Sequence, residues 1–149
     1  MSAAMLADGG APSRLVARFQ QTFQELRHDN LSRLAAVYAD DVLFEDPLHR
    51  VEGLAALTEY FERMYAGVES ISFEFGEVID APGQAMLTWT MRMTHRRLRP
   101  GEPLALPGAS HIRYDQRVHY HRDYFDAGAL LYERLPLLGT VVRAVRRRV

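Results

Sequence analysis

The chain is 149 residues long, 48% of its residues are hydrophobic and 25% are charged, and its formal net charge is −1. This length and composition are typical of one globular domain, and a nearly neutral chain has no general attraction for nucleic acid or anionic lipid. The chain has no cysteine and all 18 basic residues are arginines, which excludes thiol nucleophiles, zinc–thiolate and iron–sulfur sites, and lysine Schiff bases.

The first twelve residues differ in character from the rest of the chain. They are mostly small, include Gly9 and Gly10, and lack the basic and apolar regions of a secretory signal. We therefore expect residues 1–12 to be a disordered leader and residues 13–149 to form a single domain. No apolar run approaches the roughly 18–20 residues that a membrane span needs, so the expected compartment is the cytoplasm.

Apolar residues at helical spacing predict three helices in the N-terminal half. The first runs from residue 14 to about residue 28, and the second is a short helix over residues 31–38. Residues 42–45 then have the pattern of a short strand that ends at Asp46-Pro47. The third helix follows Gly53.

From Ser70 onwards the hydrophobic period changes from helical to two, which predicts β-strands. We expect four strands joined by short turns, at about 70–79, 85–95, 103–114 and 117–126. Helices followed by an antiparallel meander define the α+β class. A strongly twisted sheet wrapped over three helices makes a cone, and the open end of a cone is a natural pocket.

The last stretch, residues 127–149, is predicted to be a basic helix with a kink at Pro136. It contains five arginines and only one glutamate. Two roles fit this composition: a lid over the pocket mouth whose arginines face water, or an amphipathic helix that lies on a membrane surface. We favour the lid, because lipid binding usually needs more than one short basic helix.

Two sequence motifs carry a resemblance to known families. Residues 38–47 (YADDVLFEDP), followed by Gly53, resemble the ketosteroid isomerases and the wider SnoaL-like group of the nuclear-transport-factor-2-like superfamily. Residues 122–126 (RDYFD), followed by residues 135–137 (LPL) and Gly139, resemble the C-terminal segment of limonene epoxide hydrolase. Together the two resemblances extend over nearly the whole chain, and they imply a cone-shaped domain with one pocket.

The isomerase resemblance gives Asp46 the role of a proton-shuttling base. The isomerases also need a tyrosine and a protonated acid to hold the enolate oxygen, and these positions fall on Thr22 and Ser110 here. Hydroxyl groups can donate hydrogen bonds, but the loss of one strong oxyanion donor costs about 2.7–4 kcal/mol. Steroid isomerisation is therefore not expected.

The hydrolase resemblance gives Asp123 the role of the base that activates a water molecule. That family uses an aspartate–arginine–aspartate relay, and Arg92 matches its arginine. Thr94 stands where the second acid, which protonates the epoxide, would be. The resemblance therefore implies a hybrid site composed of Asp46, Asp123 and Arg92.

Strand alternation brings His121 to the same side as Asp123. Residues 119, 121, 123 and 125 would share one face of the last strand, and residues 118, 120, 124 and 126 the other. An imidazole beside two carboxylates allows acid and base roles to be divided. His119, His121 and Asp123 also have the spacing of a strand-borne metal site, but no further fixed ligand accompanies them, so no metal and no other cofactor is assigned.

Both aspartates have a structural alternative. Asp46 precedes Pro47, where an aspartate often only caps a turn. Asp123 could be a buried acid paired with Arg92 or Arg122. The register of the strand at 85–95 is also open, because Trp89 and Arg92 cannot both face the pocket unless a bulge intervenes. The predicted pocket-lining residues are Phe19, Phe23, Phe44, Phe61, Trp89, Leu106, Ser110 and Phe125.

These features predict a pocket protein for a small apolar molecule, with no nucleic-acid partner. The leading hypothesis is an enzyme that performs cofactor-free acid–base chemistry, as an isomerase, a cyclase or an epoxide-hydrolase-like enzyme. The alternatives are a non-catalytic ligand-binding protein and a membrane-surface accessory protein. In relatives of this fold the outer face of the sheet commonly pairs two subunits, which implies a homodimer formed here through Val118, Tyr120 and Tyr124.

Overall fold

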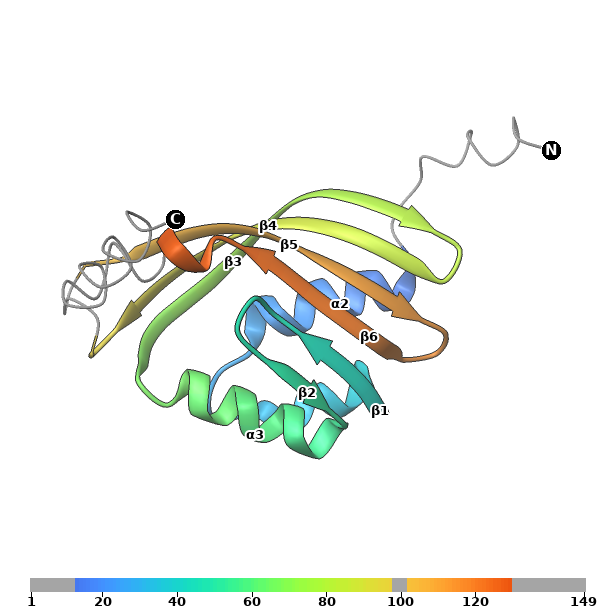
Figure 1. The fold of residues 1–149 in the computed structure, drawn as a ribbon, viewed down its shortest axis with the longest axis horizontal. Helices are drawn as coiled ribbons and strands as arrows, with labels where there is room; N and C mark the ends of the chain where they lie inside the picture. Colours follow the sequence, from blue (N-terminus) through green and yellow to red (C-terminus); the bar gives the residue numbers. More distant parts are fainter. Residues whose placement is uncertain (1–12, 98–101, 130–149) are drawn as a thin grey trace, which may run out of the picture.

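The computed structural model describes residues 13–97 and 102–129 (Figure 1). The elements in chain order are helix α2 (Arg14–Glu25), the 3-10 helix η1 (Leu31–Ala36), strands β1 (Tyr38–Glu45) and β2 (Arg50–Glu52), helix α3 (Leu54–Tyr65), and strands β3 (Val68–Ala81), β4 (Gln84–His95), β5 (Leu104–Tyr114) and β6 (Val118–Phe125). The predicted α+β class is confirmed. The expected leader and the basic tail from residue 130 onwards, with its kink at Pro136, lie outside the described residues.

One curved sheet of six strands organises these elements, in the order β2-β1-β6-β5-β4-β3. Strands β3 to β6 pair antiparallel with their sequence neighbours, as the sequence predicts. The short strand β2 was not predicted, and β1 pairs with β6 in parallel, with Phe44 opposite His121. This pairing places the end of β1, and Asp46 just beyond it, beside the strand that carries Asp123.

Helices α2 and α3 each begin at a cap. The hydroxyl of Ser13 accepts a hydrogen bond from the backbone N–H of Val16 at 3.2 Å. Gly53 precedes α3 with a φ of 91°, a backbone conformation that residues with a Cβ rarely adopt. The N–H of Gly53 donates to the carbonyl oxygen of Val42 at 2.7 Å, which ties the start of α3 to β1.

The first helix ends at Glu25, three residues before the predicted end near residue 28. Leu26 has an extended backbone and is fully buried. The side chain of Asn30 then closes the turn: it accepts a hydrogen bond from the N–H of Arg27 at 2.6 Å and donates to the carbonyl of Glu25 at 2.9 Å. A local side-chain bond to the backbone thus replaces the last helical turn.

Strand β6 contains an irregularity that simple alternation does not foresee. The pairing register with β5 shifts at the start of β6, around His119. As a result Val118 is fully buried and His119 is exposed. The predictions that Val118 lies on the outer face and His119 on the inner face are therefore wrong, whereas His121 and Asp123 both face inward.

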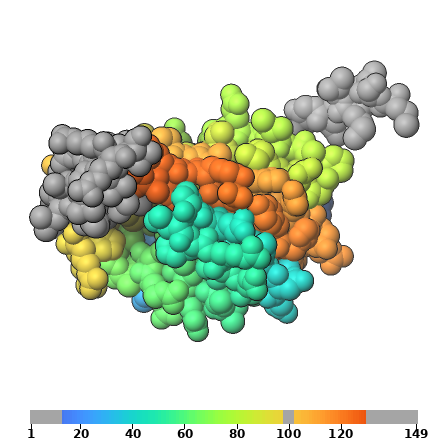
Figure 2. All heavy atoms as spheres, viewed as in Figure 1, coloured from blue at the N-terminus to red at the C-terminus, as the bar shows by residue number. Residues whose placement is uncertain are grey.

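The apolar core lies between the inner face of the sheet and the helices α2, η1 and α3 (Figure 1). In the space-filling view, β6 crosses the visible face between β5 and the β1–β2 pair (Figure 2). Among the described residues, no helix combines the length and the apolar character that a membrane span requires.

Candidate functional site

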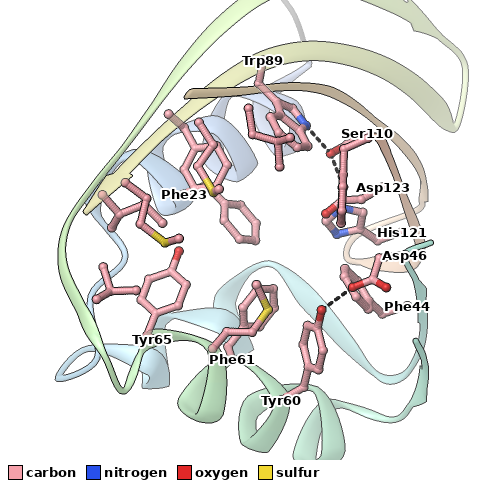
Figure 3. A pocket seen from close by; sticks show the side chains of 18 of the residues that line it. Phe23, Phe44, Asp46, Tyr60, Phe61, Tyr65, Trp89, Ser110, His121 and Asp123 are labelled. Carbon is pink, nitrogen blue, oxygen red and sulfur yellow. Dashed lines mark hydrogen bonds and ion pairs between the residues drawn. The ribbon is translucent and has the colours of Figure 1, made fainter. Parts of the chain in front are cut away.

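A cavity of about 140 Å³ lies between the inner face of the sheet and helices α2 and α3 (Figure 3). Aromatic and aliphatic side chains form most of its wall. All eight predicted pocket-lining residues lie on it: Phe19, Phe23, Phe44, Phe61, Trp89, Leu106, Ser110 and Phe125. The other polar or charged side chains on the wall are Asp46, Tyr60, Tyr65, His121 and Asp123.

Two side chains hold one oxygen of Asp123 in place. The hydroxyl of Ser110 donates to Oδ1 at 2.5 Å, and Nε2 of His121 is bonded to the same oxygen at 2.6 Å. Behind Ser110, the indole N–H of Trp89 donates to the serine oxygen at 2.9 Å. Gly108 makes room for this indole, because a Cβ at that position would lie 2.3 Å from the ring. The absence of a side chain at Gly108 thus supports the hydrogen bonds that orient Asp123.

The orientation of His121 is fixed from its other side by Tyr38. The phenolic oxygen lies 2.6 Å from Nδ1, and both side chains are buried. Burial raises the pKa of Tyr38 well above its ordinary value, with a smaller contribution from the charge of Asp123, so the hydroxyl keeps its proton. Because Nδ1 is the hydroxyl's acceptor among the described residues, we assign the neutral tautomer with the proton on Nε2, which donates to Asp123.

The hydrogen bonds form two chains that both end at Oδ1 of Asp123: one leads from Trp89 through Ser110, and the other from Tyr38 through His121. The second oxygen, Oδ2, has no hydrogen bond to the described residues, and the side chain is 19% exposed where it lines the cavity. No arginine pairs with the carboxylate in this part of the chain, because Arg92 is bonded to Glu74 and Arg122 to Glu45. The alternative in which Asp123 is a core acid paired with Arg92 or Arg122 is therefore wrong.

Asp46 has more hydrogen bonds than Asp123, and most of them order a turn. Its Oδ1 accepts the backbone N–H groups of Leu48 and His49 at 2.8 and 2.7 Å, and the imidazole of His49 lies 3.1 Å away. The hydroxyl of Tyr60 donates to Oδ2. Asp46 thus caps the turn between β1 and β2 and lines the cavity at the same time.

Arg92 lies outside the cavity, contrary to the prediction. The register between β4 and β5 runs without interruption, so Trp89 and Met91 point inward and Arg92 points outward. Its guanidinium is 3.0 Å from Glu74 on β3 and its side chain is 52% exposed. The sequence left open whether Trp89 or Arg92 faces the cavity. In the structure Trp89 faces it and Arg92 does not.

The spacing of His119, His121 and Asp123, which was considered for a metal but not assigned to one, does not bring these three side chains together on β6. His119 is exposed, on the opposite side of the strand from His121 and Asp123. Over residues 13–97 and 102–129, no three histidine, aspartate or glutamate side chains come together in a way that could hold a metal ion.

Three tyrosines at or behind the cavity wall were not predicted as site residues: Tyr38, Tyr60 and Tyr65. Helical spacing does place Tyr65 on the inner face of its helix, but nothing in that pattern separates a ligand-facing hydroxyl from a core ring. The contact between Tyr38 and His121 joins residues 83 positions apart, and no local pattern contains it.

A curved sheet that wraps over helices around one acid-bearing apolar cavity defines a small cone-shaped α+β pocket domain. The family model described as "SnoaL-like domain" matches residues 17–119, which is more than half of the chain. The protein therefore belongs to the SnoaL-like family, as the motif around Asp46 indicates. A comparison with curated proteins gave no match.

Solved structures share this fold at low sequence identity. A protein of ketosteroid isomerase-like fold from Catenulispora acidiphila DSM 44928, in complex with trimethylamine, is 15% identical with a TM-score of 0.71, over 83% of this chain and 93% of that one. A protein assigned as a SnoaL-like polyketide cyclase from Shewanella putrefaciens CN-32 is 19% identical with a TM-score of 0.69, over 83% and 97%. An LEH-like epoxide hydrolase from M. tuberculosis is 18% identical with a TM-score of 0.63, over 91% and 95%. At these identities the similarity establishes the fold.

Proposed function

We propose that this protein is an enzyme that binds a small, largely apolar molecule in the cavity and moves a proton on it with the carboxylate of Asp123, without a cofactor. The observation that carries the proposal is the different surroundings of the two oxygens of that carboxylate. One oxygen is held by Ser110 and His121, and the other lines an apolar cavity without a bond to the described residues. A carboxylate inside a protein is rare unless it is paired with a cation or used, and no cation pairs with this one in the described part of the chain.

The size of the cavity supports a small substrate. Its volume of about 140 Å³ is close to that of the engineered dry cavity of roughly 150 Å³ that accepts benzene. The expected substrate is therefore about the size of a single six-membered ring. The similar fold of a SnoaL-like polyketide cyclase and an epoxide hydrolase supports acid–base chemistry only by analogy.

Among reactions that such a base can perform, proton transfer between two carbons fits the site best. Oδ2 of Asp123 takes a proton from a carbon next to a carbonyl group, and the C–H electron pair becomes part of an enolate. Where the substrate carries a carbon–carbon double bond next to that carbon, the enolate extends into a dienolate, and the same carboxylic acid returns the proton to the far carbon of the dienolate, so the carboxylate is regenerated and no co-reactant is needed. One acid–base group is sufficient for the whole cycle.

Epoxide hydrolysis fits less well, because it requires a second acid. The attacking water gives its proton to Asp123, and the alkoxide that forms when the C–O bond breaks needs a proton from elsewhere. Thr94, at the position of that acid, is bonded to Ser70 at 2.6 Å and is not among the residues that line the cavity. Asp46 accepts at least three donors and is already used by the turn.

Hydrogen–deuterium exchange of small cyclic ketones in D₂O tests this proposal without knowledge of the natural substrate. Proton abstraction next to the carbonyl group appears as loss of the ketone's proton signal in NMR spectra. We expect Asp123→Asn to slow the protein-catalysed exchange by about 10²–10⁴-fold, the usual contribution of a positioned general base. Asp41→Asn, an exposed position on β1, is the matched control and should leave the rate unchanged. Equal rates for Asp123→Asn and the wild type would show that Asp123 is not the base, and would refute the proposal.

A second candidate is a non-catalytic binding protein for a small organic cation. Two carboxylates and many aromatic rings line the cavity, and no arginine lies among the described residues that line it. This composition suits an alkylated amine, and one structurally similar protein holds trimethylamine. Calorimetric titration with trimethylammonium separates the candidates: binding that is lost in Asp123→Asn, without ketone exchange in the wild type, favours the binding protein. The membrane-surface alternative concerns the tail outside the described residues and stays a prediction.

A further inference from the structure

The hydroxyl group of Tyr65 is a buried polar group without a hydrogen-bond partner in the described part of the chain. Tyr65 is the last residue of α3, its side chain lines the cavity, and the residue is only 4% exposed. Among the described residues its oxygen is the one buried side-chain polar atom that has no hydrogen bond. In native proteins the large majority of buried side-chain polar atoms have a hydrogen-bond partner, so an unpaired one at a cavity points to a group that arrives with the ligand.

The other polar groups on the cavity wall already have partners. Asp46 and Tyr60 are bonded to each other, and Ser110, His121 and Asp123 form one network. The missing hydrogen bond is therefore specific to the Tyr65 hydroxyl and is not shared by the other polar side chains of the cavity wall.

Tyr65 lies on the other side of the cavity from Asp123 and His121, with the rings of Phe23 and Phe61 between the two sides (Figure 3). The cavity thus has two polar ends separated by an aromatic wall. One end carries carboxylates, which accept hydrogen bonds. The other carries a phenol, and burial raises its pKa, with a smaller opposing effect of Arg27 and a further increase from the charge of Asp123. The phenol therefore stays neutral and can donate.

We infer that the hydroxyl of Tyr65 donates a hydrogen bond to an oxygen atom of the bound molecule. The ligand class is then a molecule about the size of one ring, with an acceptor oxygen such as a carbonyl at the Tyr65 end and its reacting carbon toward Asp123. This inference rests on the proposed function in one respect: it assumes that a small molecule binds in the cavity. It adds the identity of the polar group that the ligand carries and the residue that recognises it.

Two probes of nearly equal shape test the inference, toluene and benzaldehyde. Benzaldehyde adds one oxygen that only accepts hydrogen bonds, so it cannot bond to the carboxylates at the other end of the cavity. We expect Tyr65→Phe to raise the Kd of benzaldehyde by about fivefold to tenfold, the usual effect of one hydrogen bond, and to leave the Kd of toluene within about twofold. Both constants are measured by NMR titration of the full chain.

Tyr114→Phe is the matched control for these titrations. The hydroxyl of Tyr114 is bonded to Asp80 at 2.8 Å, and the residue does not line the cavity. Both constants should therefore equal those of the wild type in this variant. A benzaldehyde Kd that does not change in Tyr65→Phe, or that changes in parallel with the toluene Kd, overturns the inference.

The outcomes separate this inference from the proposed function, because the titrations measure binding and not turnover. If Asp123→Asn exchanges ketone protons as fast as the wild type, Asp123 is not the base and the proposed function is refuted. A selective loss of benzaldehyde binding in Tyr65→Phe would still support Tyr65 as the hydrogen-bond donor to the ligand. If neither probe binds the wild type, both the binding of a small molecule in the cavity and the role of Tyr65 are refuted. The melting temperature of the free protein gives a second readout: Tyr65→Phe should keep or raise it, and a fall of several degrees would reveal a protein partner for the hydroxyl and overturn the inference.

Discussion

Replacing Tyr38 by phenylalanine removes one oxygen atom from the centre of the site. That oxygen is the group that lies 2.6 Å from Nδ1 of His121, and the tyrosine is 1% and the histidine 2% exposed. Water cannot easily take the place of the hydroxyl between two such buried rings. A buried acceptor that is left without a partner costs about 1–3 kcal/mol, so we expect the free energy of unfolding to fall by this amount.

Urea denaturation, followed by the fluorescence of the single tryptophan, measures the change. Tyr38→Phe should lower the denaturation midpoint without a change in the slope m, because the area exposed on unfolding stays the same. The melting temperature should fall by about 2–4 °C for each kcal/mol. Tyr120→Phe is the matched control: its ring stacks with Arg113 through a cation–π contact that phenylalanine keeps, so its midpoint should stay at the wild-type value.

The same substitution should also affect the chemistry, for a separate reason. Without the Tyr38 hydroxyl, a hydrogen bond at Nε2 alone holds the imidazole of His121, so the position of the ring beside Asp123 is less restricted. We expect ketone exchange in the folded fraction to slow, because one of the two supports of the carboxylate is then held less firmly. If Tyr38→Phe is as stable as Tyr120→Phe, the tautomer assigned to His121 has no basis and the positioning argument for Asp123 is refuted.

Two further predictions concern pH and assembly. Because the pKa values of Tyr38, Tyr60 and Tyr65 are raised from the usual 10.0, the unfolded chain loses phenol protons above pH 10 that the folded chain retains. Below about pH 9 these tyrosines should therefore add no pH dependence to the stability, and above pH 10 the stability should fall by up to about 1.4 kcal/mol per pH unit for each tyrosine; a urea midpoint that is the same at pH 8 and pH 11 would contradict this. With Val118 buried, the predicted homodimer relies on Tyr120 and Tyr124 of the outer sheet face, where Tyr124 is 47% exposed. Tyr124→Glu should convert a dimer to a monomer in sedimentation velocity, and a wild type that sediments as a monomer at micromolar concentration would refute the pairing.

Local patterns in the sequence determined the order of the elements and much of the cavity wall. Helical spacing indicated the inward faces of α2 and α3, and alternation along the strands indicated Leu106, Ser110 and Asp123 as residues of one face. The same alternation brought His121 to Asp123, because residues two positions apart on a strand share a face. These predictions succeed because neighbours in the sequence set the direction of each side chain.

Only the tertiary structure decided what each polar side chain contacts. The parallel pairing of β1 with β6 brings Tyr38 to His121, and the register of β4 against β5 sends Arg92 outward and sets Trp89 next to Ser110. The irregularity at His119 reverses two positions that alternation assigns to opposite faces. Register and bulges depend on how distant strands align, and a single strand's sequence does not contain that alignment. For the same physical reason the candidate acids can be named from the sequence, whereas their partners, and the Tyr65 hydroxyl that has no partner among the described residues, required the folded chain.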